Sequence, residues 1–404
     1  MMSTIRLRPE ADGFKEFRTV VDTPQAQFLH DLFKSANYEL RIAGGAVRDI
    51  LRGQVPQDVD FATDATPTQM INLLEKHADR VRLILTRSGQ QHGTVTARID
   101  DKEQYEVTTL RIDKKTDGRH AEVEFIKDWQ LDANRRDLTI NSMFLDFDGT
   151  LYDFFDGLPH LKNNVIRFVG NAEDRITEDY LRILCYFRFF ARYGGQTHDE
   201  NILQCMRELN GGLEQISGER LWSEMKKLIP LKRSDEMLCH SNLWANELQF
   251  EPMTLFAALI RDESEVDSVI KRLRCSKVER ETALYIVRHR DQPTSDLCGI
   301  KESLALNGKS EFNLGKKCAL EYFKYTGDLK SHDELNNWQL PDFPVRGTVV
   351  LEHLENKQDK RQIAKVLLEL KKVWIRNDYE TSEEELLSEI PNVMKAIKQR
   401  KKSE

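Results

Sequence analysis

The sequence is poor in cysteine. Its 404 residues contain six, scattered between Cys185 and Cys318, and no two of them form a Cys-x-x-Cys pair. This distribution excludes a zinc finger or a disulfide-rich framework, and it predicts free thiols in a reducing compartment. The chain also lacks long apolar runs. None approaches the roughly 20 residues that a membrane-spanning helix needs, and the first residues have no signal-peptide core.

Basic residues are not in excess either. There are 60 Lys and Arg against 67 Asp and Glu, which gives a formal net charge of −7. This balance does not by itself indicate a nucleic-acid-binding protein, although a local basic stripe can coexist with an acidic total. The 40% hydrophobic and 31% charged residues are typical of a soluble protein with buried cores. The length predicts about two to four domains.

The first part of the chain, up to residue 150, alternates strand and helix patterns. Thr23-Pro24 and Thr66-Pro67 each predict a helix start, because threonine caps a helix and proline suits its first turn. Alternating apolar residues predict an antiparallel strand pair over 92–99 and 104–112. We expect a polar loop, a strand, a helix and a short strand pair to follow, over 113–120, 121–125, 132–144 and 145–155. This order predicts a compact α+β unit.

From Asn171 onward strand patterns nearly vanish and helical patterns follow in series, the longest over 178–193. Near the end, Ile363, Val366, Leu370 and Trp374 recur at helical spacing and predict a buried stripe. The fold class is therefore α+β: an N-terminal head with a small mixed or antiparallel sheet and helices, then an all-helical remainder. We predict four parts: head 1–150, neck 151–230, body 231–340 and tail 341–404.

The stretch 41–63 carries the first chemical signal. A strand is followed by the turn Gly44-Gly45 and a helix, and twelve residues after the turn come Asp58 and Asp60. A turn without side chains lets backbone N–H groups approach phosphates beside the positive end of a helix. Two aspartates on one strand point to the same face and can hold a divalent cation. Taken singly, the glycines also suit an ordinary turn and the aspartates a solvated strand edge.

Four motifs in order resemble those of tRNA nucleotidyltransferases, the class II CCA-adding enzymes of the DNA polymerase beta superfamily. They are GGAVRD at 44–49, PQDVDFAT at 56–63, RRDLTINSM at 135–143 and EDYLRIL at 178–184. The motifs cover about the first 230 residues, and the remainder is similar only in helical character. The sequences of these segments are most similar to those of animal members, which act in the cytosol and mitochondria.

The resemblance implies a role for each matching residue. Asp58 and Asp60 match the metal-binding carboxylates, and Glu106 matches the third catalytic acid. The residues expected to bind the nucleotide are Gly44, Gly45, Arg48, Arg136, Asp137, Asp179, Arg182 and Arg188. Without the other motifs, the natural interpretation of Arg136 and Asp137 is an ion pair on a helix surface. The polar segment 113–120, with Asp117 and Arg119, matches the flexible loop of the family.

Asp179 and Arg182 suggest how bases are chosen. Three apart on one helix they share a face, so the carboxylate can accept from an exocyclic amine while the guanidinium donates to a ring nitrogen. Cytosine and adenine both offer that pattern. Uracil and guanine offer the reverse and would leave buried groups unpaired. A plain helix ion pair is the alternative interpretation.

The chain departs from the family at Cys185, where members generally carry an arginine. We hypothesise that nucleotide binding is weaker as a result, with base selection intact. Cys185 has no apparent histidine partner nearby that would make it a nucleophile.

The predicted function is template-independent addition and repair of the 3′-terminal CCA of tRNA from CTP and ATP, with two Mg²⁺ ions. The expected partner is tRNA, bound at its acceptor stem and elbow by a monomer that has no membrane contact. The expected compartment is the cytoplasm, the mitochondrion or both, with the nucleus as a further option. The alternatives are a poly(A) polymerase, a partial enzyme adding only CC or only A, and a catalytically silent tRNA-binding protein.

Overall fold

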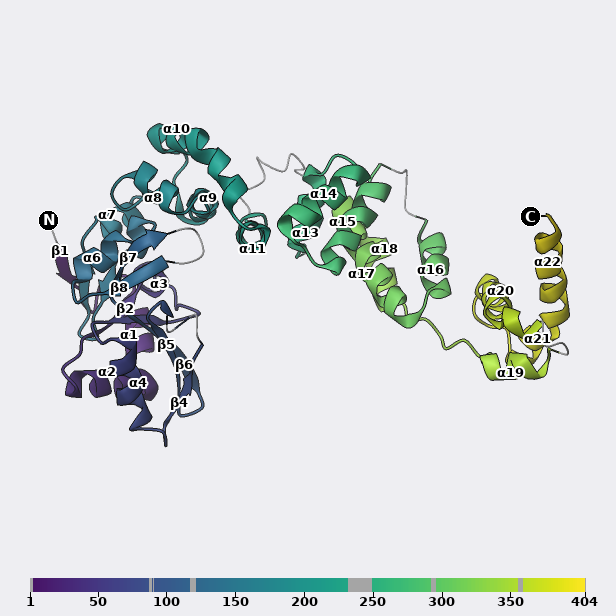
Figure 1. Ribbon diagram of the computed structural model, residues 1–404, viewed down its shortest axis with the longest axis horizontal. Coiled ribbons are helices and arrows are strands. Elements are labelled where there is room, and N and C mark those ends of the chain that lie inside the picture. Colours follow the sequence, from purple (N-terminus) through teal and green to yellow (C-terminus); the bar gives the residue numbers. More distant parts are fainter. Residues whose placement is uncertain are drawn as a thin grey trace. The chain divides into compact units, whose positions relative to one another are not determined.

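The computed structural model describes residues 3–86, 89, 91–116, 121–231, 249–291, 296–354 and 359–403. The chain divides into two compact units, Met1–Arg233 and Ser234–Glu404. Figure 1 shows strands and helices in the first unit and helices in the second, which confirms the α+β fold class with a helical remainder. No helix within the described ranges has the length and apolar character to span a bilayer.

A mixed eight-stranded sheet forms the centre of the first unit, in the order β1-β10-β9-β2-β3-β6-β5-β4. β3 and β6 are parallel, and the other neighbours are antiparallel. The strands are β1 Ser3–Arg6, β2 Leu40–Ala43, β3 Asp60–Thr63, β4 Val81–Ile84, β5 Thr94–Ile99, β6 Glu103–Thr109, β9 Phe144–Leu145 and β10 Thr150–Asp153. The predicted pairing of 92–99 with 104–112 is confirmed as β5 and β6, but β6 ends at Thr109, and Arg111 and Ile112 belong to β7.

A separate hairpin, β7 Arg111–Thr116 and β8 Ala121–Phe125, corrects the loop prediction. Asp113–Thr116 belong to strand β7, because β8 supplies their ladder partners and Glu124 forms an ion pair with Lys114 at 2.9 Å. A bulge between Asp113 and Lys115 interrupts the alternation that would have revealed the strand. Residues 117–120, with Asp117 and Arg119, lie outside the described part of the chain.

The helices of the first unit begin where the caps predict. Thr23 and Thr66 each accept a hydrogen bond from a backbone N–H in the first turn of the following helix. The helices are α1 Phe14–Val21, α2 Pro24–Ser35, α3 Gly45–Leu51, α4 Pro67–Glu75, α6 Trp129–Asn134, α7 Gly157–Lys162, α8 Ala172–Glu178, α9 Arg182–Tyr193, α10 Glu200–Leu209 and α11 Gly218–Leu228, with 3₁₀ turns η1 Thr139–Asn141 and η2 Asn210–Gln215. The helix predicted over 132–144 is wrong beyond Asn134.

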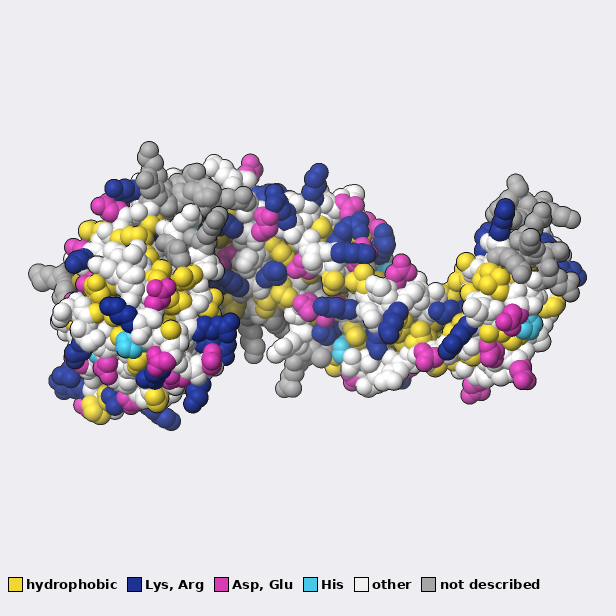
Figure 2. Space-filling view, turned by 60° about the horizontal axis from the view of Figure 1, so that its bottom comes forward, with side chains coloured by type: hydrophobic (Ala, Val, Ile, Leu, Met, Phe, Trp, Pro, Cys, Tyr) yellow, Lys and Arg dark blue, Asp and Glu magenta, His cyan; other side chains and the backbone are white. Residues whose placement is uncertain are grey.

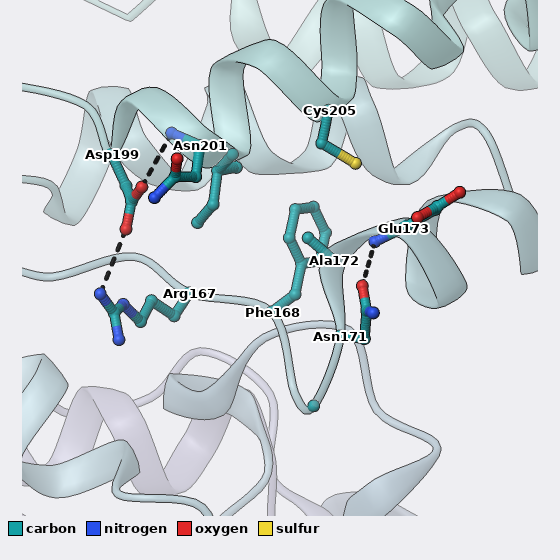
Figure 3. Close-up of a pocket in the computed structure, with 10 residues that line it drawn as sticks. Arg167, Phe168, Asn171, Ala172, Glu173, Asp199, Asn201 and Cys205 are labelled. Carbon is teal, nitrogen blue, oxygen red and sulfur yellow. Dashed lines mark hydrogen bonds and ion pairs between the residues drawn. The ribbon is translucent and has the colours of Figure 1, made fainter.

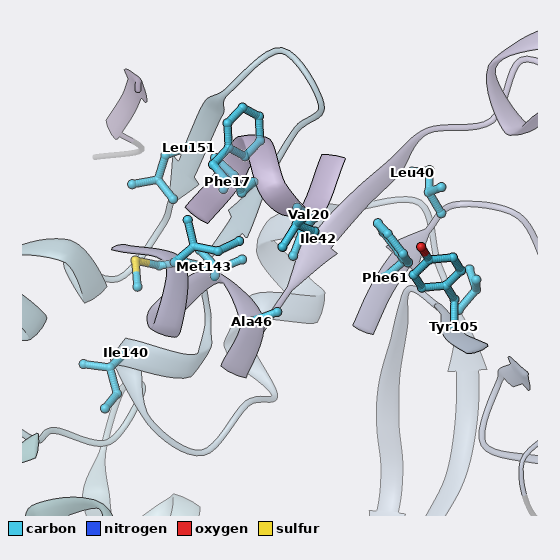
Figure 4. Close-up of a cluster of buried hydrophobic side chains, with 14 of the residues drawn as sticks. Phe17, Val20, Leu40, Ile42, Ala46, Phe61, Tyr105, Ile140, Met143 and Leu151 are labelled. Atoms are coloured by element: carbon cyan, nitrogen blue, oxygen red, sulfur yellow. The ribbon is translucent and has the colours of Figure 1, made fainter. Parts of the chain in front are cut away.

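Alternation along the strands gives the sheet two faces. One carries the main apolar core, and the other carries the carboxylates beside a smaller apolar cluster that includes Ala62 and Phe144. Phe61 and Tyr105, with ring centroids 5.4 Å apart, lie in the main core with side chains from α1, α2 and α3 (Figure 4). Their neighbours in sequence, Asp60 and Glu106, therefore point to the opposite face. The apolar face thus sets which side of the sheet carries the carboxylates.

The helix predicted over 178–193 is two helices, because Asp179 interrupts it. The backbone of Asp179 is extended, with φ −156° and ψ 102°. Its side chain accepts from the N–H of Leu181 at 3.2 Å and its carbonyl from the N–H of Arg182 at 3.0 Å. A short acidic side chain that binds the backbone in this way starts a new helix, here α9. Tyr180 packs in the break, since a Cβ on Gly212 would lie 2.1 Å from its ring.

The described residues of the second unit form helices and loops, including a nine-residue loop over 338–346, and no strand. Its helices are α13 Pro252–Phe256, α14 Glu263–Leu273, α15 Lys277–His289, α16 Leu297–Leu306, α17 Lys309–Thr326, α18 Leu329–Asn337, α19 Gly347–Glu352, α20 Ile363–Arg376, α21 Glu383–Ser388 and α22 Ile390–Ser403, with 3₁₀ turns η4 Ala257–Leu259 and η5 Asp359–Gln362. The stripe predicted on α20 is buried at Val366, Leu370 and Trp374. The division into neck, body and tail stays a prediction.

Gly13 and Gly53 offer a matched test of packing in the first unit. Both have positive φ, +84° and +69°, but a Cβ on Gly13 would lie 2.0 Å from the carbonyl oxygen of Ile50 in α3, whereas one on Gly53 meets nothing within 4 Å. Gly53→Ala should cost about 1 kcal/mol of unfolding free energy from backbone strain alone. Gly13→Ala should cost about 3 kcal/mol, because α1 must also move away from α3. Thermal unfolding measures both, and equal losses would contradict the packing described.

Candidate active site

A polar cavity of about 800 Å³ in the first unit brings most of the predicted site residues together. Its walls come from the β2–α3 turn, strands β3 and β6, the start of β7, the segment after α6, and α9. The predicted residues that line it are Gly44, Gly45, Arg48, Asp58, Asp60, Glu106, Arg136, Asp137, Arg182 and Arg188. Asp179 is not among the lining residues.

Three carboxylates converge in this cavity. Asp60 is the register partner of Glu106 on the parallel strand, so their side chains leave the same face of the sheet. Burial, followed by the charges of Glu106 and Asp58, raises the pKa of Asp60, while Arg136 acts in the opposite direction. The negative charges of Glu106 and Asp58 thus repel the ionised form of Asp60, and a bound cation would offset this repulsion.

Asp58 does not lie on the strand, contrary to the prediction. The backbone bends at Gln57 and Asp58, and β3 begins at Asp60. In the antiparallel register with β2, the residue facing position 58 would be Gly45, which already belongs to α3. The ladder therefore stops short of Asp58, although its side chain still lines the cavity.

The donor set suits Mg²⁺, which takes oxygen ligands. Within the described residues no group of three or more His, Cys, Asp or Glu is arranged to hold an ion by itself. Mg²⁺ commonly uses one or two carboxylates and completes its shell with water and substrate phosphates. Asp58 and Asp60 fit that role.

Gly44 and Arg48 line the same cavity as the carboxylates. Gly44 has φ +65°, and a Cβ there would lie 3.0 Å from the Nη1 atom of Arg136, so glycine allows the guanidinium to approach the turn. Arg48 is buried, donates to the side chain of Asn141 at 2.7 Å, and lies over the ring of Tyr193 with its Cζ 4.6 Å from the centroid. Helix α9 thereby supports a residue of α3.

Asp179 and Arg182 do not share a helix, which corrects the prediction. Asp179 accepts from Arg220 of α11 at 2.6 Å. Arg182 pairs with Glu178 at 2.6 Å. No ion pair joins the two in the described part of the chain, so the alternative of a simple helix salt bridge between them is also wrong.

Arg188 is held by the buried carboxylate of Glu224 in α11, and its Cζ lies 4.1 Å from the centroid of the Phe189 ring. Burial, followed by the charge of Glu224, raises the pKa of the nearby Cys185 thiol to about 12. A thiol with that pKa is protonated at neutral pH and is a poor nucleophile.

The sequence analysis missed several residues that line the cavity: Arg111, Arg135, Asn141, Phe189 and Lys227. Arg135 and Asn141 stand inside the RRDLTINSM motif, so that motif could have suggested them. Arg111 and Lys227 carry no local signal, because the chain brings them to the cavity from separate elements.

A second cavity of about 400 Å³ lies between α8 and α10 (Figure 3). Three of its polar side chains, those of Arg167, Asn171 and Asp199, have partners within the protein. Arg167 donates to Asp199 at 3.1 Å, and Asn171 caps α8 by accepting from the N–H of Glu173 at 2.8 Å. It contains none of the predicted site residues.

Known proteins show what the chain is similar to. Residues 40–167 match the family described as the poly A polymerase head domain. The mitochondrial CCA tRNA nucleotidyltransferase 1 of Danio rerio is 41% identical, over 93% of this chain and 92% of its own. The one of Homo sapiens is 40% identical, over 93% and 91%. A CCA-adding enzyme of Lactococcus lactis is 32% identical, over 78% and 73%.

Solved structures agree on the fold. The Bacillus stearothermophilus CCA-adding enzyme in complex with CTP has a TM-score of 0.64 at 23% identity, covering 98% of this chain and all of its own. A CCA-adding enzyme in complex with ATP has a TM-score of 0.62 at 18% identity, covering 95% and 99%. The identity to the animal proteins over almost the whole length decides the matter: this chain belongs to the CCA tRNA nucleotidyltransferase family.

Proposed function

We propose that this protein adds and repairs the 3′-terminal CCA of tRNA, using CTP and ATP. The observation that carries the proposal is the pairing of Asp60 with Glu106 across parallel strands, beside Asp58 and facing the Gly44 turn and the arginines in one cavity. The animal relatives are named for this activity. A poly(A) polymerase or a partial enzyme is not favoured by those names, and the carboxylates argue against a silent binding protein.

In the proposed reaction the terminal hydroxyl of the RNA attacks the α-phosphate of the nucleotide, and pyrophosphate leaves. Asp58 and Asp60 would hold Mg²⁺, with Glu106 beside them. The bound ions would stabilise charge on the attacking and leaving oxygens. Arg48 and Arg136 face the same space and can donate to phosphate oxygens, for which the forked guanidinium is well shaped.

Base selection by Asp179 and Arg182 stays a proposal, and the structure changes how it would work. Arg220 donates to Oδ2 of Asp179, while Oδ1 accepts from the N–H of Leu181. A carboxylate oxygen can accept two hydrogen bonds, so each retains capacity for an exocyclic amine. Arg220, from a different helix, would hold the carboxylate in place. The two base-reading residues would thus be aligned by α11 and by the α8–α9 break together.

The tRNA would bind mainly through its phosphates. Figure 2 shows Lys and Arg side chains spread over the face in view and interspersed with acidic ones. Contacts from such side chains position a nucleic acid without reading its sequence. The animal relatives are named as mitochondrial, and we propose the mitochondrion for this chain, with the cytoplasm and nucleus as further compartments. A monomer is expected.

The function is tested with tRNA transcripts that end before CCA, after C and after CC, each offered CTP and ATP singly and together. We expect addition to stop at two cytidines and one adenosine. Asp60→Ala should lower the rate at least about 10³-fold, since it removes charge stabilisation worth several kcal/mol. Asp64→Ala is the control, because Asp64 accepts from the N–H of Glu39 and does not line the cavity. A long adenosine tail, or full activity of Asp60→Ala, would overturn the proposal.

Arg220→Ala tests how the base is selected. Without its 2.6 Å partner the carboxylate of Asp179 is free to rotate, so discrimination between CTP and UTP should fall about tenfold. The measurement is the ratio of kcat/KM for the two nucleotides. Arg207→Ala is the control, since Arg207 pairs with Glu200 on the exposed surface of α10. An unchanged ratio in Arg220→Ala would mean that Arg220 does not hold the reading group.

Cys185→Arg tests the departure from the family. The added cation would lie near Asp137 and Arg188, both at the cavity, and we expect a KM for CTP and ATP about threefold lower with discrimination unchanged. Cys298→Arg adds the same charge at an exposed position on α16 and should leave KM as it is. If the two variants behave alike, the missing arginine does not explain nucleotide affinity.

A further inference from the structure

A buried carboxylate outside the predicted site organises one wall of the cavity. Asp132 lies in α6 and is 1% exposed. Its Oδ1 atom accepts from Nε of Arg135 at 2.9 Å and from the backbone N–H of Arg111 at 3.1 Å. Its Oδ2 atom accepts from Nη2 of Arg136 at 3.1 Å. Each carboxylate oxygen therefore binds the side chain of a different arginine. The Oδ1 atom also binds the backbone at the start of β7.

All three arginines line the cavity, although they come from two segments of the chain. Arg111 begins β7, whereas Arg135 and Arg136 follow α6. The Nε atom of Arg111 is buried and has no hydrogen-bond partner within the described residues, although Asp113 lies 3.8 Å away. Burial, followed by the charge of Arg135, lowers the pKa of Arg111 to about 10. Guanidinium groups crowded in this way favour an anionic ligand.

We infer that Asp132 is a positioning residue for the incoming nucleotide: it holds Arg135 and Arg136 by one edge and anchors β7, so that the remaining donors face the triphosphate. The inference rests on the proposed function. Asp132 itself does not line the cavity, so it acts only through the arginines. Without the charge of Asp132, the side chains of Arg135 and Arg136 would be free to turn toward the carboxylates of Asp60 and Glu106. The arginines would then no longer be positioned for the triphosphate.

Equilibrium binding of CTP to the full-length protein without tRNA tests this inference. Asp132→Asn should weaken binding about tenfold, because two charge-assisted contacts that orient the arginines are lost. Asp153→Asn is the matched control. Asp153 is also 1% exposed in the first unit, but accepts from the backbone N–H groups of Gly157 and Leu158 at 2.8 Å. Asp153→Asn should lower the melting temperature, while its affinity for CTP stays within about twofold of that of the wild-type protein. A dissociation constant for Asp132→Asn as close to wild type as that of the control would overturn the inference.

A double-mutant cycle with Arg135→Ala separates positioning from general damage. Arg135→Ala alone should weaken CTP binding about fivefold, and that effect should disappear in the Asp132→Asn background, whereas additive effects would contradict action through Arg135. If Asp132→Asn does not fold, Asp132→Glu keeps the charge and moves the carboxylate by one methylene. It should weaken binding about threefold, and wild-type affinity would then overturn the inference.

Steady-state kinetics test the inference in a second way, because they separate an effect on KM from an effect on kcat. With a tRNA that ends before CCA, Asp132→Asn should raise the KM for CTP while kcat changes by less than about threefold. A loss confined to kcat would contradict the inference. Because the binding assay needs no tRNA, a wild-type protein that binds CTP and adds nothing to tRNA would contradict the proposed function alone.

Discussion

The parallel pairing of β3 with β6 is the constraint on which the rest of the site depends. It sets Asp60 opposite Glu106, and the repulsion between them helps to raise the pKa of Asp60. Such a pairing is tolerable only if the strands are held from the other side. Phe61 and Val107, the apolar residues that follow the two acids on their strands, provide that hold by packing into the core with side chains from α1–α4. The face of the sheet that carries Asp60 and Glu106 can hold like charges because the opposite face packs into an apolar core.

Helix α11 holds charged side chains of the α8–α9 segment in place. Arg220 and Glu224 stand four apart on α11, so they lie on one face of that helix. The first binds Asp179 and the second binds Arg188. A single helical turn of α11 therefore fixes an acid and a base that belong to different parts of the α8–α9 segment. Rigid placement of this kind lowers the entropy lost when a nucleotide binds.

The sequence predicted the fold class, the strand pair β5–β6 and the capped helix starts, because these depend on local patterns. The family resemblance predicted ten of the twenty residues that line the cavity. Prediction from the sequence failed where tertiary contacts overrode a local pattern. Apolar periodicity runs through Asp179 without a break, and only the capping geometry around that carboxylate shows that the helix restarts. Asp58 lies two residues before a strand, as alternation suggests, yet α3 occupies the place of its ladder partner. Arg111 could not be found, since its link to Asp132 crosses 21 positions.

The cations of the site share one arrangement. Arg48 pairs with Asp49, Arg182 with Glu178 and Arg188 with Glu224, each on the wall of the cavity. A guanidinium has five N–H donors in a rigid fork, and a carboxylate occupies only one edge of it. The pairing cancels part of the buried charge and fixes the group. Arg48 is held further by the side chain of Asn141, and Arg182 by the backbone carbonyls of Arg175 and Arg135. Most of the cations that line the cavity are arginines held by protein partners, and we expect a phosphate to bind there with little rearrangement of the protein.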